Sequence, residues 1–515
     1  MATALLIETI SIQDYVYASN RLLENVGASY IVSNIYQEKM KEAIQKTIAH
    51  EVDFQTWRND QELILLEKNN TDFEIGYIGG GNALLFFREK EKAREFVKNW
   101  TTDLLIEAPG LNFAFALDST FEFNDFQNCL KRLFETLKEN KSRYFPLTSP
   151  LKHGITADCP FSGGAAEVFF EDADGKRYIS SISHKKFENA AKKNNRLLVE
   201  DILGDKYTLT NNIEKLGQGP GKNHIAVVHI DGNMIGKQFM DCTTLPEIRK
   251  LSVCVDEVMY KVYREFLGFL VKQMDFLTKE PGFNIQNEGN KTILPFRPIL
   301  IEGDDITFLT DGRLGVCFAK KYLELMSCKT LPKGARLSAS AGVAIAGTKY
   351  PFYRCYTLAE ELCSAAKREA REKPGTSWLD FHVAYGGFSS SLEEIRKANY
   401  SINEGQLNFG PYLIPQEGEN GDFDNEKNIK HLTEGIKQFL SADGWPRNRV
   451  KELRGILTLG KKATEQFLKQ MDIKGNKVHA IPGRGYHLSG WENNKTPYFD
   501  MIELLDFYPE HFLNE

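Results

Sequence analysis

The sequence predicts an α+β protein with two ferredoxin-like, palm-type domains packed together, a small connector domain and a helical C-terminal domain. Three observations predict this class. Strand-like and helix-like segments follow the order βαββαβ, this order occurs twice, and equivalent positions in the two copies keep the same spacing. The 515 residues also exceed what one hydrophobic core normally organises, so several domains are expected.

The first copy, expected over residues 1–145, starts with an apolar strand at 4–7 and continues into a helix-rich stretch over 13–48. A hairpin is predicted over 73–87, with Gly79-Gly80-Gly81-Asn82 as its tip. The later elements alternate in the same way. They are a helix over 90–104, a strand over 111–117 and an amphipathic helix over 123–139.

The less regular segment 146–220 is expected to be the connector domain, and the second copy is expected over 221–415. The second copy repeats the element order of the first. Its elements are a strand over 225–230, a helix over 245–274, hairpin strands over 298–301 and 306–309, a helix over 314–328, a strand over 337–346 and a helix over 356–372. An acidic linker over 415–427 leads into the helical C-terminal domain, expected over 416–515.

Two pairs of positions indicate that the copies are in register. Glu8 and Asp231 each follow an apolar strand, and Gly81 and Asp304 each stand third in a hairpin tip. The spacing is 73 residues in both copies. A repeat of this length predicts a duplicated domain and not a solenoid array.

Three carboxylates of the second copy are the candidate catalytic residues. Asp231 ends a buried strand, and Asp304 and Asp305 lie at the hairpin tip, which is adjacent to that strand end in a palm sheet. Like charges this close require a counter-charge. Carboxylate oxygens completed by substrate phosphates suit Mg²⁺ or Mn²⁺, which would activate a 3′-hydroxyl and stabilise a pyrophosphate leaving group. We therefore expect Asp231, Gly232, Asp304 and Asp305 to form a metal site.

Neighbouring residues are candidates for nucleotide binding. Gly232 and Gly303 have no Cβ, so a triphosphate can approach the backbone closely. Lys367, on the last palm helix, has the charge to neutralise phosphates, although a lysine on a helix is usually solvated. His229, two residues before Asp231, is expected to be a core residue or to support a ligand without being one.

The first copy is expected to be catalytically silent. Glu8 could bind a metal, but Gly81 and Asn82 replace the hairpin carboxylates. Gly80, Gly81 and Asn82 are therefore candidates only for an acceptor pocket at the interface of the two copies.

Composition and charge exclude several classes of protein. The net charge of −6 argues against a general electrostatic nucleic-acid binder. The sequence shows no apolar run of about 20 residues and no signal peptide, so no membrane association is expected. The eight cysteines form no CxxC pair, which suits a cytoplasmic protein without disulfides or a cysteine-rich zinc site.

Residues 430–477 are an exception to the overall acidity, because they carry a net charge of +6. A solvated helical face explains this charge, and contact with nucleotide phosphates or RNA is the alternative. The candidate contact residues are Arg447, Arg449 and Arg454.

With these motifs in place, the chain resembles the large subunit of type III CRISPR effector complexes, the CRISPR polymerase of the Csm and Cmr systems. The resemblance extends from residue 4 to about 385 and more loosely over 496–505. It is carried by short motifs in both copies. They are Ala4–Ser29, His229-Ile-Asp-Gly-Asn-Met-Ile-Gly236, Glu302-Gly-Asp-Asp305, Ser340-Ala-Gly-Val-Ala-Ile345, Lys349-Tyr-Pro351 and Leu358-Ala-Glu-Glu-Leu362.

The resemblance implies two palm domains, the second of GGDD type (GGDEF-like), which converts ATP into cyclic oligoadenylate messengers in antiviral defence. Asp231, Asp304 and Asp305 fall on that motif. The matching segments also imply nucleotide contacts by Asn233, Gly236 and Lys349, and partners among RNA and the effector subunits.

Several positions depart from the pattern of that family. The first hairpin glycine is Glu302 here, the second acid at the strand end is Asn233, and Gly347 replaces a basic residue. These departures leave the substrate and product open. The zinc ribbon is reduced to Cys159-Pro-Phe-Ser162-Gly163, so no zinc is expected in the connector. No HD nuclease domain is expected either, because no histidine is followed by Asp.

The sequence therefore predicts a Mg²⁺- or Mn²⁺-dependent nucleotidyltransferase or cyclase that uses ATP or another NTP. One alternative is a non-cleaving scaffold subunit that binds guide RNA and partner subunits. A second alternative, suggested by Glu302, is a nucleotide-binding sensor without turnover. Base preference, linkage, ring size and oligomeric state are not determined by the sequence.

Overall fold

The computed structural model describes most of the chain, and every structural statement below concerns the described residues. These are residues 2–513 without 69–70, 144–152, 173–174, 193–196, 198, 220, 222, 281, 387–389, 417–424 and 442–443. Most of the predicted acidic linker therefore lies outside the described residues.

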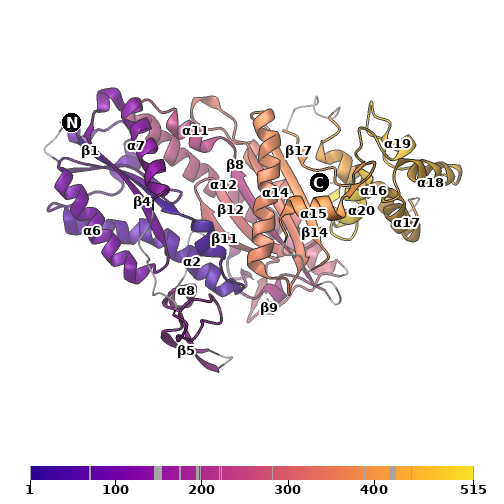
Figure 1. Cartoon of the computed structure of the whole chain (residues 1–515), viewed down its shortest axis with the longest axis horizontal. Helices are drawn as coiled ribbons and strands as arrows, with labels where there is room; N and C mark the ends of the chain where they lie inside the picture. The colour runs from indigo at the N-terminus through magenta and orange to yellow at the C-terminus, as the bar shows by residue number, and fades with distance from the viewer. Residues whose placement is uncertain are drawn as a thin grey trace.

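A four-stranded sheet organises the N-terminal part of the chain, in the order β2-β3-β1-β4 (Figure 1). Its strands are β1 (Ala2–Ile10), β2 (Phe73–Gly79), β3 (Asn82–Phe87) and β4 (Asn112–Phe121). Helices α6 and α7 cover it, and shorter helices connect its strands. The helices are α1 (Ile12–Tyr17), α2 (Leu22–Asn34), the π-helix η1 (Ile35–Lys39), α3 (Met40–Thr47), α4 (Thr56–Asn59), α5 (Leu65–Lys68), α6 (Lys90–Glu107) and α7 (Phe126–Lys141).

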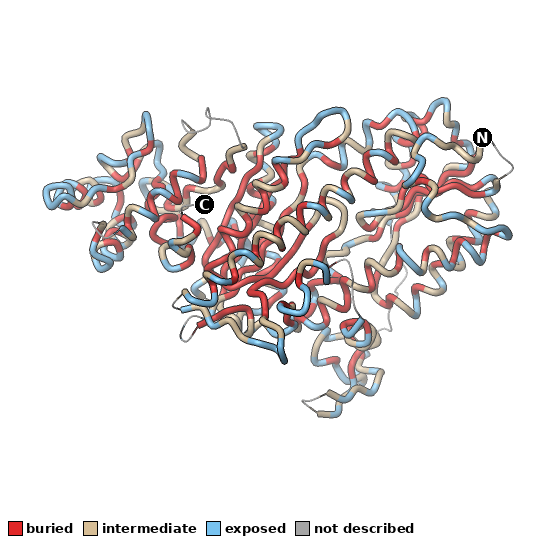
Figure 2. The backbone as a smooth tube through the Cα atoms, turned by 180° about the vertical axis from the view of Figure 1, so that it is seen from behind, coloured by how far each residue is buried: buried red, intermediate tan, exposed pale blue. Residues whose placement is uncertain are grey.

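A six-stranded sheet organises the central part, in the order β11-β12-β8-β13-β14-β17. Its strands are β8 (His224–Gly232), β11 (Phe296–Glu302), β12 (Asp305–Asp311), β13 (Ala339–Gly347), β14 (Ser377–Ala384) and β17 (Tyr412–Ile414). The helices of this part are α11 (Ile235–Met240), α12 (Leu245–Lys279), α13 (Gly315–Ser327), α14 (Phe352–Glu372) and α15 (Leu392–Asn399). Figure 2 shows its strands as a continuous buried layer.

The two sheets share strand order and register at their corresponding strands. β1 lies between β3 and β4 as β8 lies between β12 and β13. Glu8 is paired with Asn82 in the first sheet, and Asp231 is paired with Asp305 in the second. The repeat that was predicted from sequence spacing is therefore present in the strand pairing.

The two sheet units contact each other reciprocally. α2 of the first unit packs against β11, and α12 of the second unit packs against β2. Arg249 on α12 forms an ion pair with Glu74 on β2 at 2.8 Å, and both side chains are at most 2% exposed. The same guanidinium donates hydrogen bonds to the backbone carbonyls of Ile75 and Leu63. This contact fixes the relative position of the two hairpins.

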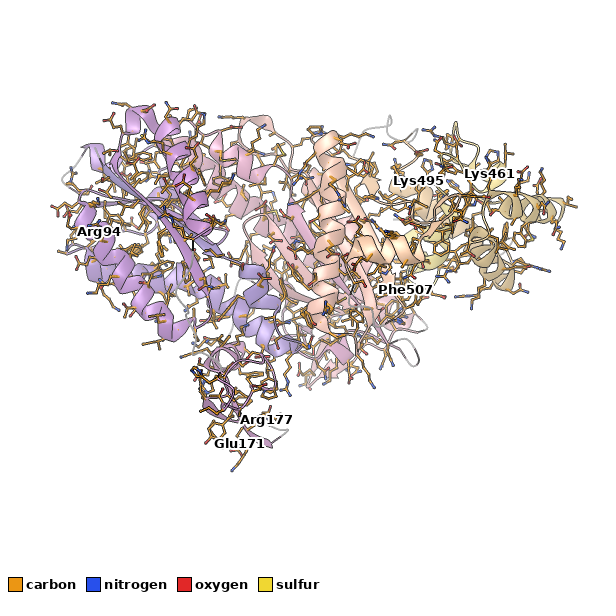
Figure 3. The ribbon with its side chains drawn as sticks, in the orientation of Figure 1. Arg94, Glu171, Arg177, Lys461, Lys495 and Phe507 are labelled. Atoms are coloured by element: carbon orange, nitrogen blue, oxygen red, sulfur yellow. The ribbon has the colours of Figure 1, made fainter. Side chains whose placement is uncertain are left out.

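The connector projects below the two sheets and docks onto the first unit through α8 (Ser181–Ala190) (Figure 1). Gly27 on α2 makes the close approach possible, since a Cβ there would lie 1.8 Å from the backbone oxygen of Lys186. A hairpin of β5 (Val168–Asp172) and β6 (Gly175–Ile179) forms its outer end, where Figure 3 shows Glu171 and Arg177. The connector continues with α10 (Glu200–Leu203) and β7 (Tyr207–Thr208), and β7 forms a small sheet with β10 (Lys291–Ile293) and β9 (Asn287–Glu288) of the second unit.

The C-terminal part is helical, as predicted, and lies at the end of the molecule opposite to β1 and α6 (Figure 1). Its helices are α16 (Ile429–Leu440), α17 (Arg447–Leu457), α18 (Lys461–Ile473), α19 (Tyr486–Ser489) and α20 (Tyr498–Leu504), with the two-stranded β15 (Ser401–Ile402) and β16 (Gly405–Gln406) beside them. Asp500 on α20 is buried and accepts hydrogen bonds from the backbone amides of Phe409 and Gly410 and from the Tyr412 hydroxyl. These bonds attach the helical part to the second sheet.

The sequence did not predict the outer strands β14 and β17 or helix α15. Asp380 and His382 interrupt the apolar pattern of β14. Both are nevertheless buried, Asp380 because it pairs with Arg396 of α15 at 2.8 Å. None of the described helices is long and apolar enough to cross a membrane.

Candidate active site at the hairpin of the second sheet

A row of acidic residues crosses the second sheet at the end of β8. Asp305, the first residue of β12, lies opposite Asp231 on one side and opposite Glu302 of β11 on the other. Directly paired residues of neighbouring strands have their Cβ atoms about 5 Å apart and point to the same face. Three carboxylates on adjacent strands are therefore neighbours on one face of the sheet.

Asp304 reaches the same place from the hairpin turn. The backbone amide of Gly232 donates to the backbone oxygen of Asp304 at 3.2 Å, which holds the turn over the end of β8. A Cβ at Gly232 would lie 2.7 Å from Oδ2 of Asp304 and 2.9 Å from Ile235. Gly303, with φ of +58°, supplies the left-handed backbone of the two-residue turn. The structure thus brings Asp231, Asp304 and Asp305 together.

Lys367 is the cation closest to these acids. Its ammonium group, on α14, forms an ion pair with Asp231. Burial opposes the charged form of Lys367 most strongly, but the charge and the hydrogen bond of Asp231, together with the nearby Asp304, outweigh it and raise the pKa of the lysine. Burial, followed by the charge of Asp231, raises the pKa of both Asp304 and Asp305 well above the usual aspartate range. The single positive charge of Lys367 therefore does not balance this group of acids.

Two further side chains surround Asp305. Gln13 Nε2, on α1 of the first unit, donates to Oδ2 of Asp305 at 3.0 Å. His229 Nδ1 lies 3.4 Å from Oδ1 and shares a hydrogen bond with the Thr307 hydroxyl at 3.0 Å. Burial lowers the pKa of His229 to about 4, so the ring is neutral near pH 7 and offers Asp305 no charge. Oδ1 of Asp305 is buried and has no hydrogen-bond partner.

The donor set fits a divalent cation by its chemistry. The site offers hard carboxylate oxygens, a buried acceptor without a partner and an excess of negative charge, which are the features that Mg²⁺ or Mn²⁺ would neutralise. No three His, Cys, Asp or Glu side chains in the described part of the chain are already arranged to hold a metal ion. Metal binding would therefore require Asp231 to turn from Lys367, whereas Asp305 could offer its unpartnered Oδ1 while Oδ2 stays bonded to Gln13.

A cavity of about 240 Å³ lies beside the acids, between the hairpin tips of the two units. Gly80 and Gly303 both line it and lie close together, since a Cβ at Gly303 would lie 3.3 Å from the Cα of Gly80. Apolar side chains such as Tyr77, Phe134 and Phe239 line the cavity together with polar ones such as Asn82 and Asp304, and we call it the inter-tip cavity. It is lined by Glu8, Tyr77, Gly79, Gly80, Asn82, Phe134, Ile235, Gly236, Phe239, Ser252, Val255, Asp256, Gly303 and Asp304.

The first unit lacks a matching group of acids, as its sequence predicted. Glu8 is held by Lys141 at 2.5 Å, and the Asn82 amide donates to the backbone oxygen of Gly80 at 2.9 Å within the tip. Gly81 does not line the inter-tip cavity. A Cβ at Gly81 would lie 2.3 Å from Ile12, and its carbonyl accepts a hydrogen bond from Tyr36. Of the three proposed acceptor residues, the structure places Gly80 and Asn82 at the cavity.

Two of the proposed nucleotide-binding residues are placed elsewhere. The Asn233 side chain binds within the fold, to the Ser340 hydroxyl at 2.9 Å and to the backbone oxygen of Thr376 at 3.1 Å. The last residue of β13, Gly347, pairs with the first residue of β8, His224, and Lys349 follows just after it. Asp231 lies at the other end of β8. Eight strand residues separate these ends, which is roughly 25 Å. The structure therefore does not bring Lys349 to the acids, because the antiparallel pairing reverses the direction of β13.

The three arginines proposed for nucleic-acid contact are all ion-paired. Arg447 pairs with Asp506, Arg449 with Glu452 at 2.5 Å, and Arg454 with Glu503 at 2.9 Å. Glu503 is almost fully buried, so Arg454 serves as its counter-charge. The basic face of residues 430–477 remains a candidate surface, but these three arginines already have partners in the fold.

Sequence reasoning missed the contacts that helix α1 of the first unit makes with this site. Besides Gln13, Tyr17 of α1 stacks on Tyr356 of α14, with 3.6 Å between ring centroids and 19° between planes. Tyr356 in turn contacts the His229 ring. Both residues lie within the segment Ala4–Ser29 that carries the family resemblance, but only the spatial arrangement of the two units shows that they contact the acidic hairpin and helix α14.

Comparisons with known proteins agree with this architecture. No family model matches the chain, and no curated protein matches it. Among solved structures, Csm1 of T. onnurineus matches 99% of this chain and 70% of its own, with 13% identity and a TM-score of 0.50. An apo Csm1–Csm4 cassette matches 98% and 70%, with 12% identity and a TM-score of 0.49. A Csm1–Csm4 subcomplex of the type III-A CRISPR-Csm interference complex matches 98% and 69%, with 12% identity and a TM-score of 0.47.

The fold and the site together define a two-sheet α+β protein with an acidic hairpin in its second sheet. Over nearly its whole length, the chain has the fold of Csm1. This likeness in fold confirms, at the level of the fold, the resemblance predicted from the sequence. At 13% identity the likeness establishes the fold alone.

Proposed function

We propose that the chain is a metal-dependent nucleotidyltransferase or nucleotide cyclase whose active site is the acidic hairpin of the second sheet. One observation carries the proposal. The strand register places Asp231 opposite Asp305, and Asp304 lies over Gly232, next to a cavity that both units line. Acids with raised pKa values grouped beside a cavity are typical of a functional site.

The proposed reaction joins two nucleotides. The 3′-hydroxyl (or 2′-hydroxyl) oxygen of one nucleotide forms a bond to the α-phosphorus of another. The bond from that phosphorus to the α–β bridging oxygen breaks, pyrophosphate leaves, and the hydroxyl proton passes to solvent. Asp231, Asp304 and Asp305 would hold Mg²⁺ or Mn²⁺, with the Gly232 carbonyl as a further candidate ligand. When bound, the cation supplies the positive charge that favours the attacking oxygen and the leaving group.

The residues of the chain have separate roles in this proposal. Lys367 provides the fixed positive charge for substrate phosphates, and Gln13 and His229 orient Asp305. Gly232 and Gly303 leave room for phosphates at the backbone, while Gly236 lines the inter-tip cavity. The apolar walls of that cavity suit a nucleoside.

We further propose that both sheet units are ferredoxin-like palms. Under this proposal, residues 1–145 and 221–415 are the silent and catalytic palms, 146–220 the connector and 416–515 the C-terminal domain. The shared strand order and register support the palm assignment. The docking of α8 onto α2 and the contacts of Asp500 support two smaller attached domains.

The proposal predicts nucleotide turnover by the purified protein. The full chain would be incubated with each NTP and Mg²⁺ or Mn²⁺, with and without RNA, and products would be identified by mass spectrometry. We expect cyclic or linear oligonucleotides with ATP, and none from an Asp304→Ala/Asp305→Ala variant. Csm1–Csm4 cassettes have been solved with one ATP, cA3 and cA4, which makes these the first compounds to examine. The absence of product from every NTP under all conditions would overturn the proposal.

A second candidate function is a scaffold subunit or a nucleotide sensor without turnover. It is favoured by the pairing of Asp231 with Lys367 and of Asp305 with Gln13, which engages one oxygen of each carboxylate. A scaffold would copurify with RNA of fixed length and with effector subunits. A sensor would bind an NTP and return it unchanged, which the same mass spectra would reveal.

A further inference from the structure

The connector buries one lysine against the first unit. Lys186 of α8 is only 3% exposed, and its ammonium donates a hydrogen bond to the backbone oxygen of Tyr15 on α1 at 2.5 Å. The same ammonium lies 4.3 Å from the centre of the Tyr15 ring. It forms no ion pair with any carboxylate in the described part of the chain. Burial lowers the pKa of Lys186 to about 8, against the opposing charge of Glu24, so most of the lysine stays charged near pH 7.

The position of this cation on α1 has a physical reason. α1 has six residues and no side-chain cap at its N-terminus. Helices this short are marginal by themselves, and the backbone carbonyls of their last turn have no partner within the helix. A cation at the C-terminal end of a helix satisfies such a carbonyl and interacts favourably with the helix dipole. Lys186 therefore fixes the last turn of α1 from the connector.

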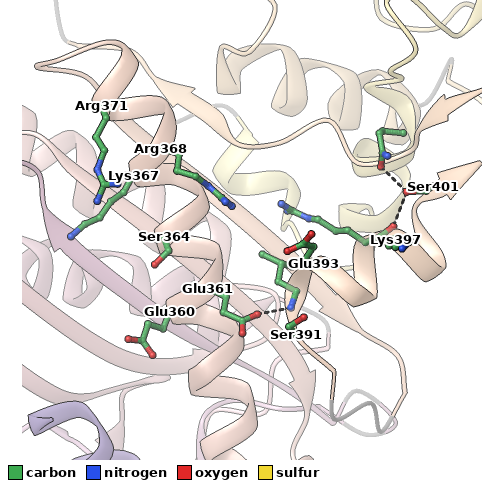
Figure 4. A pocket seen from close by; sticks show the side chains of 13 residues that line it. Glu360, Glu361, Ser364, Lys367, Arg368, Arg371, Ser391, Glu393, Lys397 and Ser401 are labelled. Atoms are coloured by element: carbon green, nitrogen blue, oxygen red, sulfur yellow. Dashed lines mark hydrogen bonds between the residues drawn. The ribbon is translucent and has the colours of Figure 1, made fainter.

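α1 makes two contacts with the second unit. Gln13 donates to Oδ2 of Asp305 at 3.0 Å, and Tyr17 stacks on Tyr356 of α14. Figure 4 shows Lys367 further along the same helix α14. The helix that Lys186 fixes at one end thus contacts both an acid of the hairpin and the helix that carries the lysine of the site.

We propose that Lys186 is a positioning residue for the acidic hairpin and acts on it through α1. The inference rests on the proposed function only in treating Asp305 as part of the active site. While Lys186 holds the last turn of α1, Gln13 is presented to Asp305, and a shift of the connector releases this bond. The docking of the connector and the geometry of the hairpin are thus coupled, and such a coupling acts in both directions.

The neighbouring Lys185 provides a matched control on the same helix. Its ammonium pairs with Glu188 at 3.3 Å and with Glu107 at 3.9 Å. Lys185→Met therefore removes the same charge from α8 but leaves the bond to Tyr15 in place. Lys186→Met keeps an apolar side chain of similar length, and the close backbone approach of Lys186 to Gly27 does not depend on the ammonium. The two variants differ mainly in the contact with α1.

The test follows hydrogen–deuterium exchange of the full chain in EDTA by mass spectrometry, so neither metal nor turnover contributes. We expect Lys186→Met to speed exchange in the hairpin peptides over 300–308 about fivefold, which is the effect of one lost hydrogen bond. Lys185→Met should exchange there like the wild type, with α16 as the internal reference for global stability. A lysine that only attaches the connector would change exchange in α8 and α1 alone.

Two further variants test the route through α1. The double variant Gln13→Ala/Lys186→Met should exchange in the hairpin no faster than Gln13→Ala, because both changes remove the same bond. In the reverse direction, Gln13→Ala should speed exchange in α8, which tests the coupling without any change in the connector.

Four results would each overturn the proposal. They are unchanged hairpin exchange in Lys186→Met, an equal increase in Lys185→Met, fully additive effects in the double variant, and unchanged exchange of α8 in Gln13→Ala. A failure of nucleotide turnover leaves these measurements unaffected, so the two proposals fail separately.

Discussion

Gln13 of the first unit donates a hydrogen bond to Asp305 of the second, with 3.0 Å between Nε2 and Oδ2. The two residues are 292 positions apart and meet because α1 lies against α14. The unit without a hairpin carboxylate therefore contributes directly to the site of the other unit. This relationship gives the first unit a contact with the acidic hairpin although its own hairpin has no carboxylate.

Replacing Gln13 by Ala should make divalent-cation binding require a higher pH. The hydrogen bond from Gln13 opposes the effect of burial and lowers the pKa of Asp305, so its loss raises that pKa further. We expect the pH midpoint of Mn²⁺ binding, followed by electron paramagnetic resonance, to rise by about half to one unit. Gln45→Ala, an exposed glutamine of the same unit, should not move it. An unchanged midpoint in Gln13→Ala would show that the bond has no effect on Asp305.

The metal-free protein should lose stability as the pH rises through neutrality. Burial and the charge of Asp231 raise the pKa of Asp304 to about 7 and that of Asp305 to about 8. The folded carboxyls keep protons that the unfolded chain releases above about pH 4. Their contribution to the free energy of unfolding therefore falls between about pH 4 and pH 8. Urea denaturation in EDTA should show a flatter pH profile for Asp304→Asn/Asp305→Asn, and parallel profiles would contradict the electrostatic description.

Lys367 and Lys349 should differ sharply when each is replaced by Met. Lys367 pairs with Asp231, whereas Lys349 lies at the opposite end of β8. We expect Lys367→Met to lower the rate of nucleotide joining by about 100-fold, because a fixed positive charge at the phosphates is lost. Lys349→Met should stay within about twofold of the wild type. Equal losses in steady-state assays of the two variants would show that the strand register does not decide which lysine acts.

The ion pair between Arg249 and Glu74 should be a major contribution to stability. Arg249→Met leaves Glu74 buried without a counter-charge, which typically costs about 3–5 kcal/mol. The adjacent Lys250 forms an exposed pair with Glu62, so Lys250→Met should change the free energy of unfolding by less than about 0.5 kcal/mol. Chemical denaturation measures both. Adding Glu74→Gln to Arg249→Met should recover part of the loss, and no recovery would contradict a charge-based explanation.

The elements that follow a local rule could be predicted from the sequence. Apolar strands with a glycine-containing turn between them predicted both hairpins, and equal spacing from Glu8 and Asp231 predicted their register. β14 was missed because Asp380, which would be unfavourable in a buried strand by itself, is stabilised by Arg396 from a later helix. Short-range patterns do not contain such a pairing.

The residues of the candidate site also divide into those that local sequence spacing groups and those whose position depends on strand pairing or packing. Asp231, Asp304 and Asp305 come from one strand and one hairpin, so sequence spacing was enough to group them. The motif that grouped Lys349 with these acids does not show which way its strand runs. β13 pairs antiparallel with β8, so Lys349 lies at the other end of the sheet. Gln13 comes from the other unit, and its contribution depends on how the two units pack.

The most direct test of the account is to locate the cation. Crystals of the full chain soaked with Mn²⁺ and a non-hydrolysable ATP analogue would be measured at a wavelength where manganese scatters anomalously. The account predicts an anomalous peak within about 2.3 Å of carboxylate oxygens from Asp231 and from Asp304 or Asp305, with Lys367 no longer paired to Asp231. A map with clear density for these side chains but no peak between them would contradict the central claim.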